Sequence, residues 1–93
     1  MDERTLLFTD IVDSTQVTRR LGDEAAMALW GDHDRRAREL LEELGGLEID
    51  RTDGFFLLFA DVTAAARFAI GYHERVMSLG LAARVGLHHA AVA

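Results

Sequence analysis

The chain of 93 residues contains no cysteine, no proline and no lysine. The absence of cysteine excludes disulfides, thiolate zinc sites and cysteine nucleophiles, so any metal ligand must be an oxygen or an imidazole. No apolar run approaches the roughly 20 residues that span a bilayer. The first residues also lack the apolar core and cleavage site of a signal peptide. We therefore expect no membrane insertion and a cytoplasmic setting.

Positive charge is scarce as well. Ten basic residues stand against 16 acidic ones, which gives a formal net charge of −6. Proteins that bind the phosphate backbone of DNA or RNA need a basic surface, so nucleic acid is not an expected partner. Phe55, Phe56 and Phe59 could form a base-stacking platform on an RNA-binding sheet. Without basic companions they are better interpreted as core residues.

Apolar runs and turn residues predict one small domain, 1–93, with four strands and three helices. The strands are expected at 5–9, 47–51, 55–59 and 82–87, and the helices at 16–21, 23–44 and 63–78. Helix caps are expected at Asp13, Ser14 or Thr15, at Asp23, and at Asp61 or Thr63. The order fits an α+β, ferredoxin-like sandwich, which is a split βαβ arrangement with an antiparallel sheet and helices on one face.

Two aspartates are predicted to meet at one edge of this sheet. Asp10 ends the first strand, and Asp53 lies in the turn before Gly54, because Asp-Gly is a strong hairpin signal. Right-handed crossovers place this hairpin at the exit end of the first strand. Two carboxylates there could hold Mg²⁺ or Mn²⁺, and the amides of 12–15 could bind phosphate. From spacing alone, both aspartates are more typical of caps and turns than of a metal site.

Beyond their spacing, the identities of these residues resemble the motifs of a known family. Phe8-Thr9-Asp10-Ile11-Val12-Asp13-Ser14-Thr15 resembles the opening strand-and-loop motif of class III adenylyl and guanylyl cyclases. Further segments are similar to later landmarks of that family, in the same order: Leu21-Gly22-Asp23, Trp30 with His33-Asp34-Arg35, Gly45-Gly46-Leu47-Glu48, Asp53-Gly54-Phe55 and Arg84-Val85-Gly86-Leu87-His88. An ordered set that extends along nearly the whole chain is more specific than any single motif.

The resemblance implies a cyclase palm core and a site. Asp10 and Asp53 would be the catalytic carboxylates, and with the backbone carbonyl of Ile11 they would bind two Mg²⁺ or Mn²⁺ ions. The implied reaction converts a nucleoside triphosphate, ATP more than GTP as a family expectation, into the 3′,5′-cyclic monophosphate and pyrophosphate. The expected substrate contacts are Val12, Asp13, Ser14, Thr15 and Arg51.

The sequence also departs from the family. The lysine that usually precedes the second metal aspartate and reads the purine is absent, with Asp50 or Ile49 in its place. Arg51 could contact substrate or be a solvated strand residue. Family domains continue beyond Val92-Ala93, where an asparagine and an arginine complete a site shared across a dimer. We therefore expect part of a catalytic domain that works as a homodimer or with another cyclase-like chain, with weak or no activity alone.

Two other interpretations remain open. The chain could be a non-catalytic cyclase-like module for regulation or dimerisation, and a diguanylate cyclase is a more distant third. His33 and His73 are interpreted as packing histidines on inner helix faces, and Trp30 as a core or dimer-surface residue. His88 and His89 are neighbours on a strand, so they should face opposite sides and cannot share a metal ion.

Overall fold

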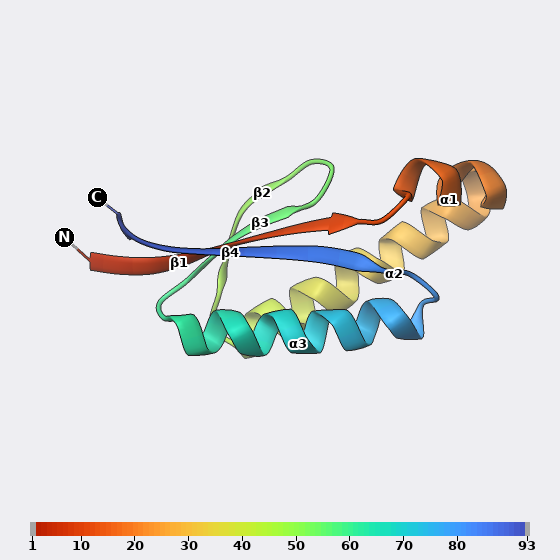
Figure 1. Ribbon diagram of the computed structural model, residues 1–93. Coiled ribbons are helices and arrows are strands. Elements are labelled where there is room, and N and C mark those ends of the chain that lie inside the picture. The colour runs from red at the N-terminus through yellow and green to blue at the C-terminus, as the bar shows by residue number, and fades with distance from the viewer. Residues whose placement is uncertain (1, 93) are drawn as a thin grey trace.

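A four-stranded antiparallel sheet with helices packed on one face makes up the fold in the computed structural model, which describes residues 2–92 (Figure 1). Met1 and Ala93, the ends of the predicted domain, lie outside the described residues. The elements are β1 (Asp2–Ile11), α1 (Ser14–Leu21), α2 (Asp23–Glu43), β2 (Leu47–Arg51), β3 (Phe55–Phe59), α3 (Val62–Ser78) and β4 (Ala83–Val92). The predicted α+β, ferredoxin-like fold is confirmed, and no helix within 2–92 is long and apolar enough to cross a bilayer.

The strand order is β2-β3-β1-β4, which puts β1 and β3 side by side at the centre. β1 pairs with β3 in a register that runs from Thr5 opposite Phe59 to Phe8 opposite Phe56. Because β2 and β1 are both antiparallel to β3, the β2–β3 turn lies near the end of β1, as Figure 1 shows. The predicted arrangement of these strands is confirmed.

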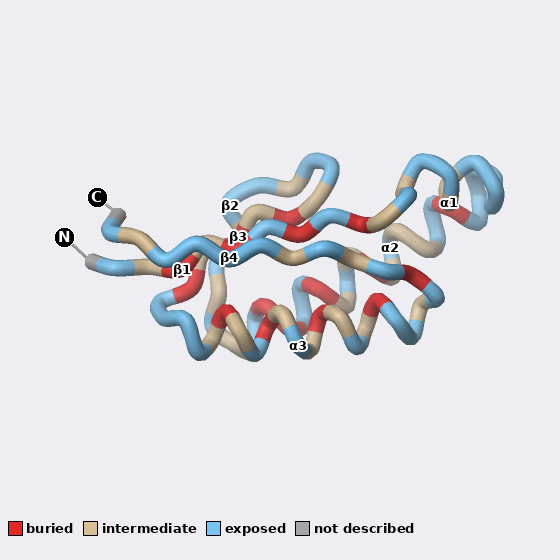
Figure 2. The backbone as a smooth tube through the Cα atoms, viewed as in Figure 1, coloured by how far each residue is buried: buried red, intermediate tan, exposed pale blue. Residues whose placement is uncertain are grey.

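Alternation along β1 decides which side chains face the helices. Leu7, Thr9 and Ile11 are buried, whereas Phe8 and Asp10 between them are exposed on the opposite, open face of the sheet (Figure 2). This period of two is the geometry of any strand with one covered face. The covered face therefore contains the core, and Asp10 is directed away from it.

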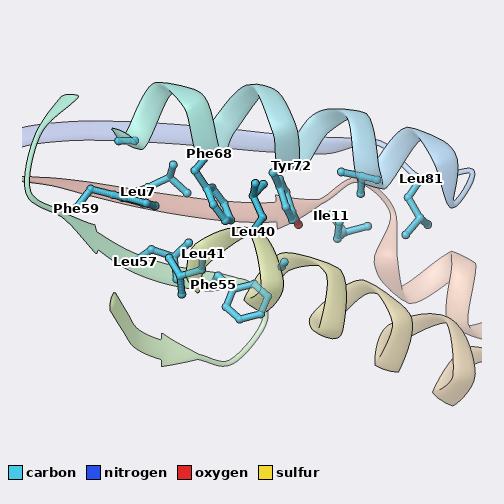
Figure 3. Packing of buried hydrophobic residues seen from close by; sticks show 13 residues of the cluster. Leu7, Ile11, Leu40, Leu41, Phe55, Leu57, Phe59, Phe68, Tyr72 and Leu81 are labelled. Carbon is cyan, nitrogen blue, oxygen red and sulfur yellow. The ribbon is translucent and has the colours of Figure 1, made fainter. Parts of the chain in front are cut away.

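Aromatic and leucine side chains fill the space between the sheet and the helices α2 and α3 (Figure 3). Phe68 on α3 packs against Phe59 on β3, with ring centroids 5.5 Å apart, and stacks on Tyr72 at 5.6 Å. Leu40 and Leu41 come from α2. Burying a side chain of this size contributes about 1.5–3 kcal/mol, so the aromatic row anchors α3 on the sheet.

Several helix and strand ends, and some helix caps, differ from those predicted. The first helix begins at Ser14 instead of residue 16, and Asp13 adopts a left-handed conformation with φ 56° and makes no side-chain cap bond. Asp23 is the first residue of α2 and does not cap it, whereas Asp61 does cap α3 by accepting from the Ala64 amide at 2.8 Å. The last strand continues through His88 and His89, because ten residues of β4 pair with β1.

Candidate functional site

A cavity of about 440 Å³ opens where β1 ends. Its walls come from β1, α1, α2 and the β2–β3 hairpin. They are formed by Thr9, Ile11, Ser14, Thr15, Thr18, Arg19, Trp30, His33, Arg51, Thr52, Asp53 and Gly54. Five of the residues predicted for the site line this one cavity: Ile11, Ser14, Thr15, Arg51 and Asp53.

Asp53 reaches the cavity because its turn packs tightly against β1. A Cβ built on Gly54 would lie 1.7 Å from the backbone oxygen of Thr9, so only glycine fits there. The Phe55 amide also donates a buried hydrogen bond to Thr9 Oγ1 at 2.8 Å. These two contacts join the segment that carries Asp53 to the residue preceding Asp10.

Asp10 lies beside this cavity but is not among the residues that line it. Its Cα partner on β4 is Arg84, whose Nη1 lies 3.4 Å from Asp10 Oδ2 on the open face. The two carboxylate-bearing segments therefore meet at one edge of the sheet, with Asp10 paired to an arginine. The spacing of the two carboxylates for a shared cation remains a prediction.

The start of α1 contributes polar groups to the same cavity. The first backbone hydrogen bond of α1 runs from the Val17 amide to the Asp13 carbonyl. The amides of Ser14 and Thr15 come before this bond, so they have no acceptor within the helix. Such helix starts attract anions. The Val12 amide, however, donates to the Ala82 carbonyl at 2.9 Å and is not available to phosphate in this structure.

Arg51 is not the solvated strand arginine that was considered. Its Nη2 donates to Asp34 Oδ1 at 2.7 Å, and its guanidinium carbon lies 4.8 Å from the centroid of the Phe55 ring. Its side chain is only 21% exposed. Burial opposes ionisation of Asp34, but the hydrogen bonds from Arg51 and His33 prevail and lower the pKa of that carboxyl.

His33 is a packing histidine, as predicted, but it is also hydrogen-bonded at both ring nitrogens. Nδ1 lies 2.8 Å from Asp34 Oδ1, and Nε2 lies 2.6 Å from the Tyr72 hydroxyl. Burial lowers the pKa of His33. Burial also raises the pKa of Tyr72 to about 12. Both groups are therefore neutral near pH 7, beside an ionised Asp34.

A resident metal centre does not fit the acidic residues here. Within residues 2–92 no group of three or more histidine, aspartate or glutamate side chains gathers into a possible metal site. Two carboxylates and one carbonyl instead suit Mg²⁺, which commonly binds one or two protein carboxylates and takes further oxygens from substrate phosphates. Whether Asp10, Ile11 and Asp53 act together as ligands of such a cation remains a prediction.

Sequence reasoning did not find several of the residues around this cavity. Thr18 accepts a hydrogen bond from Trp30 Nε1 at 2.9 Å and so fixes the indole beside the cavity. Arg84 and Asp34 were also missed as partners of Asp10 and Arg51. Only Thr9 could have been recognised from the sequence. It is a polar residue at a position where the alternation of β1 predicts burial, so its hydroxyl should need a hydrogen-bond partner.

No protein-family model matches this chain, and no curated protein matches it either. Solved structures do. Adenylate cyclases from Trypanosoma brucei, in their monomeric state, match with a TM-score of 0.84 and 20% identity over 96% of this chain and 56% of theirs. The guanylate cyclase domain of RhGC from Catenaria anguillulae, in complex with GTP, matches with a TM-score of 0.83 and 17% identity over 95% of this chain and 56% of that one.

A third match is the dimeric guanylyl cyclase domain of the RhoGC fusion protein from Blastocladiella emersonii. Its TM-score is 0.83 and its identity 17%, over 96% of this chain and 58% of that chain. The expected fold, that of class III adenylyl and guanylyl cyclase catalytic domains, is confirmed. The chain spans somewhat more than half the length of these structures.

Proposed function

We propose that residues 1–93 form part of a class III nucleotide cyclase catalytic domain, which converts a nucleoside triphosphate into the 3′,5′-cyclic monophosphate and pyrophosphate. The observation that carries this proposal is the cavity at the end of β1, where Asp53, Ile11 and the first residues of α1 line one space on a cyclase fold. ATP is the preferred substrate as a family expectation. A cytoplasmic setting is part of this proposal.

The roles of the residues follow from their positions. Asp10, Asp53 and the carbonyl of Ile11 would hold Mg²⁺ or Mn²⁺, which when bound lowers the pKa of the substrate 3′-hydroxyl and stabilises charge as pyrophosphate leaves. Ser14 and Thr15 would bind phosphate oxygens through amides and hydroxyls at the start of α1. Val12 and Asp13 belong to the same loop, and Arg51 would add positive charge at the cavity wall.

We further propose that two such chains, or this chain and another cyclase-like chain, pair in the active form. Apolar side chains on the open face of the sheet support this, because no helix within residues 2–92 covers that face (Figure 1). Phe8 on β1 is 42% exposed and packs edge-on against Phe56 at 4.7 Å, and Leu47 on β2 is 58% exposed. A patch of this kind is typical of a protein interface.

The test compares three variants, each of which replaces one carboxylate by a neutral amide. The protein is incubated with Mn²⁺ and ATP or GTP, alone and mixed with a full-length cyclase chain, and cyclic product is measured. Asp10→Asn and Asp53→Asn should lose turnover while keeping a cooperative melt. Glu74→Gln is the matched control, because Glu74 is exposed on α3 and does not line the cavity, and it should retain activity. Absence of product from the unmodified protein under both conditions would reject catalysis.

A second candidate is a non-catalytic cyclase-like module that binds nucleotide or pairs with another chain. One observation favours it for the chain taken alone, since it spans only 56–58% of the cyclase structures above. Such a module would still bind a nucleoside triphosphate or a partner. Nucleotide binding without cyclic product, measured by calorimetry in the presence of Mn²⁺, would favour this function over the first.

A further inference from the structure

Arg51 and Phe55, the two residues that flank the Asp53 turn, each make a hydrogen bond that leads away from the turn. Arg51 ends β2, Phe55 begins β3, and the two are Cα partners. Arg51 donates to Asp34 at 2.7 Å. On the other side, the Phe55 amide donates to Thr9 Oγ1 at 2.8 Å. His33 and Tyr72 lie between these two ends, so we call these six residues the His33 network.

The ionised state of Asp34 and the neutral state of His33 together determine which atom donates in each hydrogen bond of His33. Asp34 is ionised and can only accept, so His33 Nδ1 must carry the proton in their 2.8 Å contact. A neutral imidazole then leaves Nε2 as an acceptor, and the Tyr72 hydroxyl must donate at 2.6 Å. Burial raises the pKa of Tyr72 and the neighbouring Thr9 side chain opposes this rise, while Thr9 Oγ1 accepts from the Phe55 amide. No buried side-chain nitrogen or oxygen within the described residues lacks a partner.

Ring contacts strengthen the same connection. The Phe55 ring stacks on His33, with centroids 5.9 Å apart and an interplanar angle of 28°. The Arg51 guanidinium lies on that ring as well. His33 is only 3% exposed. Both residues at the base of the turn therefore contact the His33-Asp34 pair of α2, one through charge and the other through its ring.

We propose that His33 and Asp34 are positioning residues that hold the Asp53 turn against the end of β1, with His33 in the Nδ1–H tautomer. Thr52 and Asp53 in the turn are exposed, so the turn is held by the close approach of Gly54 to Thr9 and by the residues at its base, Arg51 and Phe55. The effect on the order of the turn is independent of any reaction. The effect on cation binding at Asp53 rests on the proposed function.

The first test needs no substitution. Long-range proton–nitrogen NMR spectra of the unmodified protein at neutral pH distinguish the two imidazole tautomers. We expect His33 to carry its proton on Nδ1, with Nε2 unprotonated. A proton on Nε2 would reverse the direction of the Tyr72 bond and overturn the proposal.

The second test compares Asp34→Asn with Asp32→Asn. Both aspartates lie on α2 and each accepts from an arginine at 2.7 Å, but Asp32 pairs with exposed Arg35 on the outer surface. Hydrogen exchange of the amides at 52–54 should quicken by about tenfold in Asp34→Asn, because local opening becomes easier. The Asp32→Asn protein should match the unmodified one. Equal exchange rates in the two folded variants would overturn the proposal. If Asp34→Asn does not fold, the NMR measurement of the His33 tautomer tests the proposal instead.

A third measurement separates this proposal from the proposed function. Mn²⁺ titration followed by Trp30 fluorescence should show affinity lowered by about tenfold in Asp34→Asn, as expected when support around a metal ligand is lost. Trp30 is the only tryptophan and lines the cavity. If the unmodified protein binds no Mn²⁺, with or without a nucleoside triphosphate, but the turn still loosens in Asp34→Asn, the positioning role stands and the proposed function fails.

Discussion

Arg84 and Asp10 face each other across β4 and β1, with Arg84 Nη1 3.4 Å from Asp10 Oδ2. Their side chains are 71% and 60% exposed, so water and salt screen the attraction. Exposed pairs of this kind contribute little to stability. The pair therefore contributes little to the fold, and under the proposed function Arg84 would compete with a cation for Asp10.

Replacing Arg84 by alanine should make Asp10 a better cation ligand. A positive charge that competes for the carboxylate is removed, so the affinity of the substrate-free protein for Mn²⁺ should rise by about two- to fivefold, in line with a weak exposed pair. The midpoint of unfolding should not change. Mn²⁺ titration by electron paramagnetic resonance measures the first quantity. Arg35→Ala, which removes an exposed arginine from the outside of α2, should leave the affinity unchanged.

Gly54→Ala should disrupt the junction between the hairpin and β1. The added Cβ would lie 1.7 Å from the Thr9 oxygen, and backbone atoms on both sides must move. We expect a loss of about 2 kcal/mol or more in the free energy of unfolding. Gly31 in α2 has nothing within 4 Å of its built Cβ, so Gly31→Ala should stabilise the protein by about 0.5–1 kcal/mol. Urea unfolding of both variants checks the contrast, and equal destabilisation would contradict it.

Tyr72 gives a direct optical test, because it is the only tyrosine. Burial raises the pKa of Tyr72 to about 12 in the folded protein, whereas the unfolded chain should titrate near pH 10. The folded state then keeps a proton that the unfolded state loses. Its contribution to stability is full below about pH 10 and is lost as the pH rises toward 12. Tyrosinate absorbance in native and urea-unfolded protein should show the two midpoints, and coinciding midpoints would refute buried Tyr72.

The lowered pKa of His33 predicts a loss of stability in acid, whereas the raised pKa of Tyr72 predicts a loss in alkali. Its pKa is lowered by burial, so below about pH 6.5 the unfolded chain binds a proton that the folded protein does not. Stability should therefore fall as the pH drops through this value and level off below the folded pKa. His33→Asn should flatten this part of the profile, although the protein as a whole will be less stable. His88→Asn, a change at an exposed position on β4, serves as the control in the same urea experiments.

Local sequence was sufficient for much of the fold. The bounds of β2 and β3 were predicted to the residue, because an Asp-Gly turn between two apolar runs specifies a hairpin. The alternation of Leu7, Thr9 and Ile11 with Phe8 and Asp10 could be read directly from the order of residues. The lengths of β1 and β4 could not, because their outer residues are ordered by pairing with each other, more than 70 positions apart.

The candidate site divides in the same way. The sequence alone determined that Asp10 ends a strand and that Asp53 lies in a turn, since both features depend on a few neighbouring residues. Tertiary structure alone decided that Arg84 pairs with Asp10, and that Arg51 turns inward to Asp34. These contacts join residues from different elements, and no local pattern of charge or hydrophobicity specifies which distant side chain will occupy the remaining space.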